Sequence, residues 1–295
     1  MTILVACGGD ENSGDTDGGA DDGLPEIGFA TPTEVTTAYR DLDPGWEVVG
    51  AANWSCLGTP STETMNAVDV NLTGEVQDFQ SNDPIPDAEI TLFGDDGITS
   101  TALSTATADQ DGKYALVLPA GQTLWAFKLV TDNALDTYTL NEYFDDAQTA
   151  QTAIIDSVSE STAQALPAFI GVTRTPGLGI VSGSIRDCDG NRVKGAIVTV
   201  SSTVDEVTPV MGSVGYYFSA LSTSLPVRHS QQSFTNDDGV FVVIELPEGQ
   251  ERFLQIWGFV DAADMADGSM TLLGQVATPI VADAVVKVTT RPLRQ

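Results

Sequence analysis

The sequence predicts an all-β protein made of two β-sandwiches in tandem, with a short bridging helix and a disordered acidic segment at the N-terminus. Apolar residues make up 42% of the 295 residues, enough to fill two ordinary cores. Short stretches in which apolar and polar residues alternate are separated by glycine-containing turns, a pattern typical of strands. The same order of stretches occurs twice, so each copy is expected to form one sandwich.

The chain is expected to divide into five segments. Residues 1–26 carry the start of the chain and the acidic segment, and residues 27–66 form an extended segment packed on the first sandwich. The first sandwich takes residues 67–140. A linker with a helix takes residues 141–176, and the second sandwich takes residues 177–295.

The segment around Cys7 resembles a bacterial lipobox, Leu4-Val5-Ala6-Cys7, followed by Gly8. In such motifs the cysteine sulfur receives a diacylglycerol and the chain is cut before the cysteine. The acyl chains then anchor the protein at ~0.8 kcal/mol per buried methylene. The six residues before Cys7 include no basic residue and are shorter than a signal peptide, which an upstream start or a trimmed sequence would explain.

The resemblance implies a lipid-anchored protein of the bacterial cell envelope, and Gly8 after the cysteine implies the outer membrane. The alternative is an ordinary cysteine near a frayed terminus. Residues 10–23 contain no aromatic residue and no aliphatic residue larger than alanine, so they cannot bury enough surface to offset their ordering entropy. Their aspartates do not follow the spacing of an EF-hand loop. We therefore interpret this segment as a flexible tether.

The chain is strongly acidic, with 12 lysines and arginines against 42 aspartates and glutamates and a formal net charge of −30. Such a surface repels phosphate backbones, which argues against nucleic-acid binding. A well-solvated surface explains the charge, and calcium or a basic partner is the alternative. No stretch approaches the ~20 apolar residues that span a bilayer, so the expected membrane contact is the lipid anchor.

With Cys7 assigned to lipid, Cys56 and Cys188 remain. An even remainder in an oxidising compartment predicts a disulfide. It would tie the segment before the first sandwich to the second sandwich, and closing so long a loop stabilises the fold by ~4–5 kcal/mol at most. Two unrelated thiols are the alternative.

Two parts of the chain repeat one pattern. Each opens with a glycine, an aliphatic residue two positions later and an aspartate two after that, followed by a strand with alternating apolar residues. An Asp-Gly turn, which is a strong hairpin signal because glycine accepts positive φ, then precedes a strand that ends at proline-x-glycine. The first copy comprises Gly74, Val76, Asp78, Ala88, Ile90, Leu92, Gly112, 114–118, Pro119 and 124–129; the second comprises Gly183, Ile185, Asp187, Ala196, Val198, Val200, Gly239, 241–246, Pro247, 253–257 and 285–288.

This order of G-x-V-x-D, P-x-x-A-x-I-x-L and D-x-D-G-x-Y-x-L-x-L-P-x-G is similar to the carboxypeptidase regulatory-like domain. The resemblance covers roughly residues 68–131 and 178–292. It implies two Greek-key sandwiches of the immunoglobulin-like or prealbumin-like (transthyretin-like) kind with seven strands each, a fold shared with collagen-binding B-type repeats. In carboxypeptidases this domain is the non-catalytic one, which implies a binding or structural role.

Residues 143–169 show helical spacing of apolar residues, with Ile154, Ile155 and Val158 followed by Leu166 and Phe169. The stretch 146–165 lacks glycine and proline, and an aspartate at 145 or 146 could cap a helix. We therefore predict a helix of about four turns that bridges the sandwiches. A loop rich in threonine and serine is the alternative.

The second copy has an insertion of roughly twenty residues before its Asp-Gly turn. Long loops on sandwiches often carry recognition, and aromatic residues are favoured contacts. The candidate ligand contacts are Tyr216, Tyr217, Phe218 and His229. The alternative is that the three aromatic residues belong to a strand and pack inward.

No catalytic residue, metal site or cofactor is predicted. His229 is the single histidine, too few for a zinc peptidase, and no nucleophile elbow surrounds it. The expected function is a non-catalytic envelope lipoprotein that presents two sandwiches for binding an envelope protein or polysaccharide, or as spacers. The alternatives are a carboxylate-based hydrolase with a site between the second sandwich and the helix, and a calcium-dependent adhesin.

Overall fold

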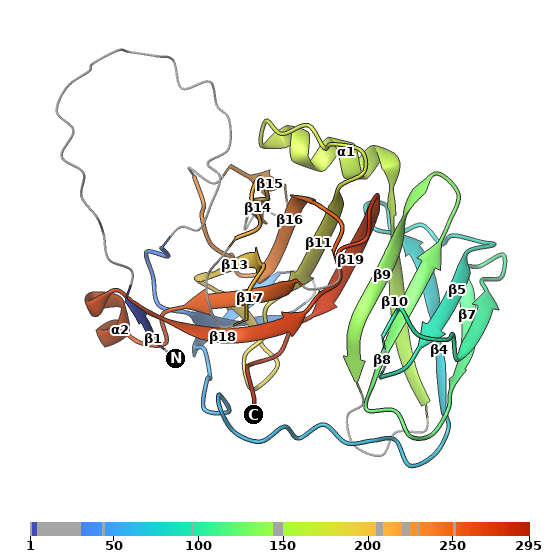
Figure 1. The fold of residues 1–295 in the computed structure, drawn as a ribbon, viewed down its shortest axis with the longest axis horizontal. Coiled ribbons are helices and arrows are strands. Elements are labelled where there is room, and N and C mark those ends of the chain that lie inside the picture. The colour runs from blue at the N-terminus through green and yellow to red at the C-terminus, as the bar shows by residue number, and fades with distance from the viewer. Residues whose placement is uncertain are drawn as a thin grey trace.

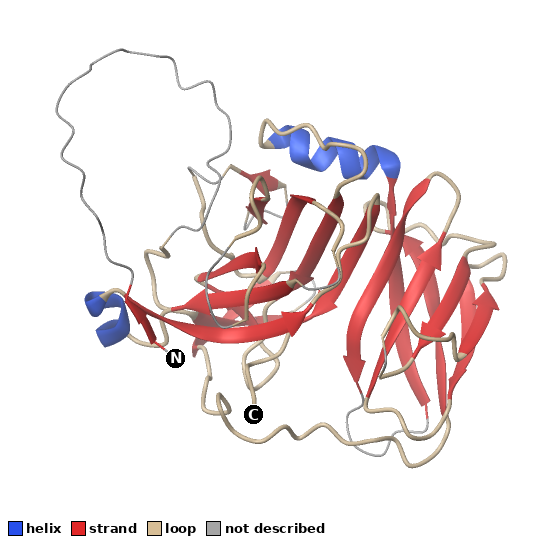
Figure 2. Cartoon of the chain, in the orientation of Figure 1, coloured by secondary structure: helices blue, strands red, loops and turns tan. Residues whose placement is uncertain are grey.

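The computed structural model describes residues 2–4, 31–42, 45–95, 97–143, 150–204, 209–219, 225–228, 231–249 and 252–295. Strands dominate the described residues, so the all-β prediction is confirmed (Figure 2). Cys7, the tether at 10–23 and His229 lie outside the described residues.

Seven strands form the first sandwich. One sheet has the order β7-β4-β10 and the other the order β6-β5-β8-β9, and Leu72, Ile90, Leu116 and Phe127 are among the side chains that fill the space between them. The strands are β4 (Val70–Asp78), β5 (Glu89–Phe93), β6 (Ser104–Thr107), β7 (Lys113–Leu118), β8 (Leu124–Val130), β9 (Ala134–Tyr143) and β10 (Ala150–Ser159).

The prediction of a four-turn helix in the linker is wrong for most of its length. Residues 150–159 form β10, the seventh strand of the first sandwich, paired in parallel with β4. Ile155 and Ser157 are buried while Ile154 is exposed, which is the period of a strand. The helix α1 (Glu160–Phe169) begins only at its N-cap, Ser159.

Seven further strands repeat this topology in the second sandwich (Figure 1). The first and last strands again pair in parallel, and one difference is that β14 pairs with β16, whereas its counterpart β6 pairs with β5. The strands are β11 (Gly179–Ser184), β13 (Ala196–Ser201), β14 (Val214–Phe218), β16 (Val240–Leu246), β17 (Phe253–Gly258), β18 (Ser269–Ala277) and β19 (Ala284–Thr289), with β12 (Arg192–Lys194), β15 (Pro226–Val227) and α2 (Ala262–Asp267) in addition.

The Asp-Gly turns show why both copies need their motif glycine. Gly112 and Gly239 have φ of +75° and +62°. A Cβ on Gly112 would lie 2.7 Å from the carbonyl oxygen of Val76, and one on Gly239 would lie 3.0 Å from that of Ile185. Val76 and Ile185 are the aliphatic residues of the repeated motif, so the turn packs against the same strand position in each copy.

The two sandwiches are joined by pairing between strands. β19 of the second sandwich pairs in parallel with β9 of the first, from Ala284 opposite Asp136 to Val288 opposite Leu140. The main core of the second sandwich also includes Phe93 and Tyr138 of the first. One sheet therefore runs through both sandwiches, and α1 packs at the junction (Figure 1).

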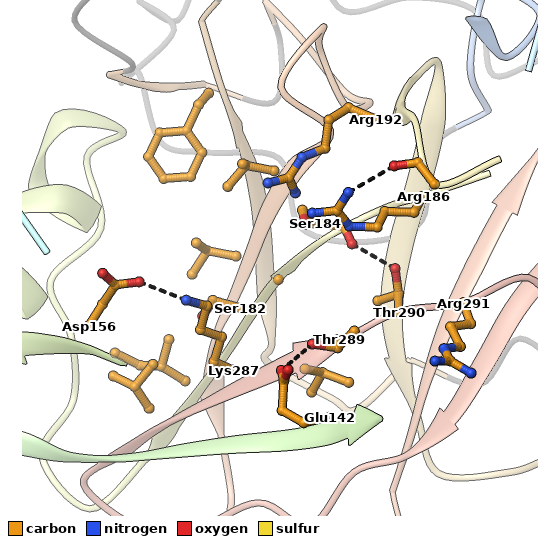
Figure 3. Close-up of a pocket in the computed structure, with 18 of the residues that line it drawn as sticks. Glu142, Asp156, Ser182, Ser184, Arg186, Arg192, Lys287, Thr289, Thr290 and Arg291 are labelled. Atoms are coloured by element: carbon orange, nitrogen blue, oxygen red, sulfur yellow. Dashed lines mark hydrogen bonds and ion pairs between the residues drawn. The ribbon is translucent and has the colours of Figure 1, made fainter. Parts of the chain in front are cut away.

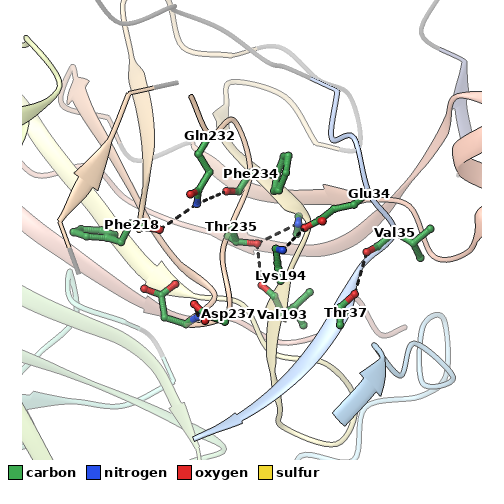
Figure 4. Close-up of polar contacts among 12 residues, drawn as sticks. Glu34, Val35, Thr37, Val193, Lys194, Phe218, Gln232, Phe234, Thr235 and Asp237 are labelled. Atoms are coloured by element: carbon green, nitrogen blue, oxygen red, sulfur yellow. Dashed lines mark hydrogen bonds and ion pairs between the residues drawn. The ribbon is translucent and has the colours of Figure 1, made fainter. Parts of the chain in front are cut away.

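The expectation that residues 27–66 pack on the first sandwich is wrong for their described part up to Cys56. The hairpin of β2 (Thr37–Asp41) and β3 (Trp46–Ala51) pairs with β12 of the second sandwich. Lys194 Nζ lies 3.3 Å from Glu34 Oε1 beside this pairing (Figure 4). Trp54 is buried in the second sandwich's core, where its apolar surface leaves water.

Two further contacts fasten the N-terminal part to the second sandwich. Cys56 and Cys188 form a disulfide, with Cα atoms 5.9 Å apart, so the predicted pair is present. The short strand β1 (Thr2–Leu4) pairs antiparallel with β18. No helix among the described residues has the length and apolar character to cross a membrane.

Candidate functional site

A groove of about 1030 Å³ lies where the two sandwiches meet. Its floor is the outer face of the second sandwich's sheet, because alternate residues of a strand point to opposite faces. On β11, Ser182 and Ser184 line the groove while Val181 points into the core, and on β19 the same alternation places Lys287 and Thr289 in the groove. The register sets Ser182 opposite Lys287 and Ser184 opposite Thr289.

One end of the groove is apolar and lies under α1. Residues of α1, β10, β11, β14, β16 and β19 line it. Ser159 accepts a hydrogen bond from Thr162 N at 3.1 Å, which caps the helix, and Thr162 Oγ1 donates to Gln80 Oε1 at 3.0 Å. The lining residues at this end are Val158, Ala163, Leu166, Pro167, Ile180, Tyr216, Phe218, Val240, Val242 and Val285.

The other end of the groove is rich in basic side chains. Five of the chain's 12 lysines and arginines line the groove, although the formal net charge of the chain is −30. They come from the β11–β12 connection and β12, and from β19 and the residues after it. These five are Arg186, Arg192, Lys287, Arg291 and Arg294.

Two of these cations are paired with carboxylates. Lys287 Nζ lies 2.7 Å from Asp156 Oδ2 (Figure 3). Arg291 forms an ion pair with Glu63. Burial raises the pKa of Glu142, although a hydrogen bond from Thr289 Oγ1 at 2.6 Å and the nearby cations favour its charged form.

Arg186 and Arg192 differ from these pairs. They face each other across an antiparallel bridge, and no carboxylate lies within ion-pairing distance of either among the described residues. Arg186 donates to the carbonyl oxygen of Gly190 at 2.8 Å, and Nη1 of Arg192 is buried without a partner. Burial and the charge of Arg186 lower the pKa of Arg192 to about 10. Two adjacent positive charges thus face the groove (Figure 3).

The aromatic residues proposed as ligand contacts lie on β14 and pack inward. Tyr216 and Phe218 are 2% and 4% exposed and sit beneath the apolar end of the groove. Tyr217 points into the opposite core, where its hydroxyl accepts a hydrogen bond from Val198 N at 2.9 Å. The three residues therefore belong to a strand, as the alternative expected, while Tyr216 and Phe218 also line the groove. The described residues contain no group of three or more His, Cys, Asp or Glu side chains placed to hold a metal ion.

Sequence reasoning missed the basic end of the groove. A signal was present, because Arg186, Arg192 and Lys194 lie close together in the chain, as do Lys287, Arg291 and Arg294. These six are half of the chain's 12 basic residues. The parallel pairing of β11 with β19 then brings five of the six to the groove, while Lys194 pairs with Glu34 outside it.

No family model and no curated protein matches the chain. Similar solved structures include the Bacillus anthracis TIE protein, at 13% identity and a TM-score of 0.27, covering 75% of this chain and 33% of that one. The shaft pilin SpaA from Lactobacillus rhamnosus GG is 11% identical with a TM-score of 0.23, covering 76% and 97%. The major pilin subunit BcpA of Bacillus cereus is 11% identical with a TM-score of 0.26, covering 76% and 99%. The chain thus spans about a third of the TIE protein, and its function has to be argued from the groove itself.

Proposed function

We propose that this chain is a non-catalytic binding protein of the bacterial cell envelope, with two carboxypeptidase regulatory-like sandwiches held at the outer membrane by lipid on Cys7. Its ligand, part of an envelope protein or polysaccharide, binds in the groove between the sandwiches. The observation that carries the proposal is the groove itself. It has the size of a ligand site, an apolar end and a concentration of cations in a strongly acidic chain.

Blocking the groove tests the binding proposal. Ser184→Trp would fill the floor without entering the core, because Ser184 faces outward. Released envelope peptides and envelope polysaccharide are offered separately to the full chain, and backbone hydrogen exchange reports which amides are protected. Protection is expected in β11, β19 and residues 186–192, and Ser184→Trp should remove it.

Val117→Trp is the matched control, because Val117 is 44% exposed on β7 and does not line the groove. Ser182→Phe is a second blocking variant if Ser184→Trp does not fold. Protection that survives both blocking variants would place the binding site elsewhere and contradict the proposal.

The anchor has its own test. The chain is expressed with a complete signal peptide, and Cys7→Ser is compared with the parent by detergent partitioning and by incorporation of labelled palmitate. We expect the parent to enter the detergent phase and the variant to remain in the aqueous phase, because acyl chains supply the membrane affinity. Equal partitioning of the two would contradict lipid attachment at Cys7.

A carboxylate-based hydrolase is the second candidate. The groove lies between the second sandwich and α1, and it contains Glu142, whose pKa is raised by burial as in general acids. Both oxygens of Asp156 are occupied, Oδ1 by Gln77 Nε2 at 3.0 Å and Oδ2 by Lys287, which favours a structural role for that carboxylate. Products formed from either envelope fraction by the parent and not by Glu142→Gln would favour the hydrolase.

A further inference from the structure

Arg186 and Arg192, at the basic end of the groove, form no ion pair with a carboxylate among the described residues. Guanidinium groups that are partly removed from water without a counter-charge are unfavourable, and two adjacent ones repel each other. Asp238 and Asp41 interact electrostatically with Arg192, and Glu142 with Arg186, but none of these carboxylates forms an ion pair with either arginine. The oxygens of Asp187, which follows Arg186, accept hydrogen bonds from the backbone N–H groups of Asp189, Asn191 and Asn53. An anion bound between Arg186 and Arg192 would supply the missing charge, and the arginine fork suits a carboxylate.

The middle of the groove offers hydrogen bonds along a straight line. Ser182, Ser184 and Arg186 project from one face of the β11 segment at every second residue. The hydroxyls of Ser182 and Ser184 form no hydrogen bond within the described part of the chain. From Ile180 to Arg186 the segment measures roughly 20 Å, the length of about six residues of extended peptide.

The lining distinguishes among ligands that carry a carboxylate. Sugars need exposed aromatic faces on which to stack, whereas Tyr216 and Phe218 are almost fully buried. A long acidic polysaccharide would also be repelled by a chain with a net charge of −30. A fatty acid would leave the serine hydroxyls without partners. An extended peptide satisfies the hydroxyls with its backbone and places apolar side chains under α1.

We infer that the groove binds the C-terminal segment of an extended peptide, with its terminal carboxylate held between Arg186 and Arg192 and its apolar side chains directed toward α1. This inference rests on the proposed function and names the ligand class of the same groove. The carboxylate supplies an ion-pair partner, which neither Arg186 nor Arg192 has among the described residues. The peptide N–H and C=O groups bond to Ser182 and Ser184.

Synthetic hexapeptides test the inference on the full chain. A mixture with apolar residues at its first three positions, which would lie under α1, is made once with a free C-terminal carboxylate and once with a C-terminal amide. Binding is measured by calorimetry. We expect the amide forms to bind ~10–100-fold more weakly, because they lack a charge-assisted hydrogen bond. Arg186→Gln and Arg192→Gln should each weaken binding of the free-carboxylate forms by a similar factor.

Arg40→Gln is the matched control, since Arg40 is an exposed cation on β2 outside the groove, and it should bind as the parent does. If Arg192→Gln does not fold, Arg192→Lys keeps the charge without the fork and should still weaken binding. Equal affinity for the carboxylate and amide forms would overturn the inference. So would arginine-dependent binding of oligogalacturonate or laurate in place of the peptides. Either result could leave the Ser184→Trp effect intact, so this inference and the proposed function can fail separately.

Discussion

Asp238 is a buried carboxylate of the second sandwich, and its charged form is less favourable in the folded than in the unfolded state. It lies in the Asp-Gly turn, only 7% exposed, and its Oδ1 accepts a hydrogen bond from Val240 N at 2.9 Å. Burial, assisted by the charge of Asp237, raises its pKa from 3.8 to about 6. The folded state therefore binds the proton more tightly than the unfolded state, so this group stabilises the fold below pH ~4 and the stabilisation is lost as pH rises through 6.

Asp238→Asn should remove that loss while keeping the acceptor for Val240 N. We expect the variant to match the parent near pH 4 and to exceed its free energy of unfolding by up to about 3 kcal/mol at pH 7–8. Urea denaturation across this pH range measures the difference. Asp111→Asn, at the equivalent and exposed position of the first copy, is the control and should show no such gain. A gain in the free energy of unfolding of Asp238→Asn that does not depend on pH would contradict the raised pKa of Asp238.

Asp78 and Asp187, the aspartates of the repeated motif, accept the same kind of local hydrogen bonds, but their substitution should affect stability differently. Each accepts hydrogen bonds from backbone N–H groups of the turn that follows it. Asp187 is 3% exposed and also accepts from Asn53 N at 3.0 Å, which ties the N-terminal part to the second sandwich. Removing it would leave several donors in partly buried surroundings unsatisfied.

We expect Asp187→Ala to cost about 2–4 kcal/mol of unfolding free energy and Asp78→Ala about 1 kcal/mol, because water can reach the donors around Asp78. Urea denaturation of both variants measures the two costs. Equal costs would show that the contact with Asn53 contributes nothing to the fold.

At the scale of elements, β10 shows where local pattern and tertiary structure diverge. The spacing of apolar residues from Ile154 to Phe169 fits a helix, and the last ten residues of that stretch do form α1. The first part becomes a strand because β4 offers it a parallel partner and the first core takes up Ile155. The spacing of residues within this stretch cannot reveal that it pairs with β4. Comparison with the closing strand of the second copy would, however, have indicated a seventh strand.

Two neighbouring isoleucines test the strand. Ile155 is 2% exposed and belongs to the first core, whereas Ile154 is 58% exposed. We expect Ile155→Ala to cost about 2–4 kcal/mol and Ile154→Ala less than about 1 kcal/mol, both measured by urea denaturation. The reverse order would mean that residues 150–159 do not pair as they do with β4.

The groove was less predictable than the strands. The repeat predicted strands at corresponding positions of the two copies, and cysteine counting predicted the pair Cys56 and Cys188. The groove depends instead on pairing between copies, in which β9 lies beside β19 and β10 lies on the other side of β9. Lys287 meets Asp156 only because of that junction. Motif spacing within one copy carries no information about it.

At the scale of the whole molecule, three connections join the tandem sandwiches. β9 pairs with β19, one hydrophobic core contains residues of both sandwiches, and α1 packs on both at the junction. The disulfide adds a covalent link between the N-terminal part and the second sandwich across 132 residues of sequence that include the whole first sandwich. A groove formed at such a junction keeps its shape only while the sandwiches remain associated.

The chain should therefore unfold in one cooperative transition. At ~0.7 kcal/mol per residue, a folded body of this size has an unfolding enthalpy of roughly 170 kcal/mol near 60 °C, and a single sandwich has about half of that. Calorimetry should give one peak whose van't Hoff enthalpy equals the calorimetric value. Cys56→Ser combined with Cys188→Ser should lower the midpoint temperature of unfolding without splitting the peak, because the β9–β19 pairing remains. Reductant should lower the parent's midpoint temperature and leave that of the variant unchanged. Two peaks with the disulfide intact would mean that the sandwiches fold independently and that the pairing between them is too weak to hold the groove together.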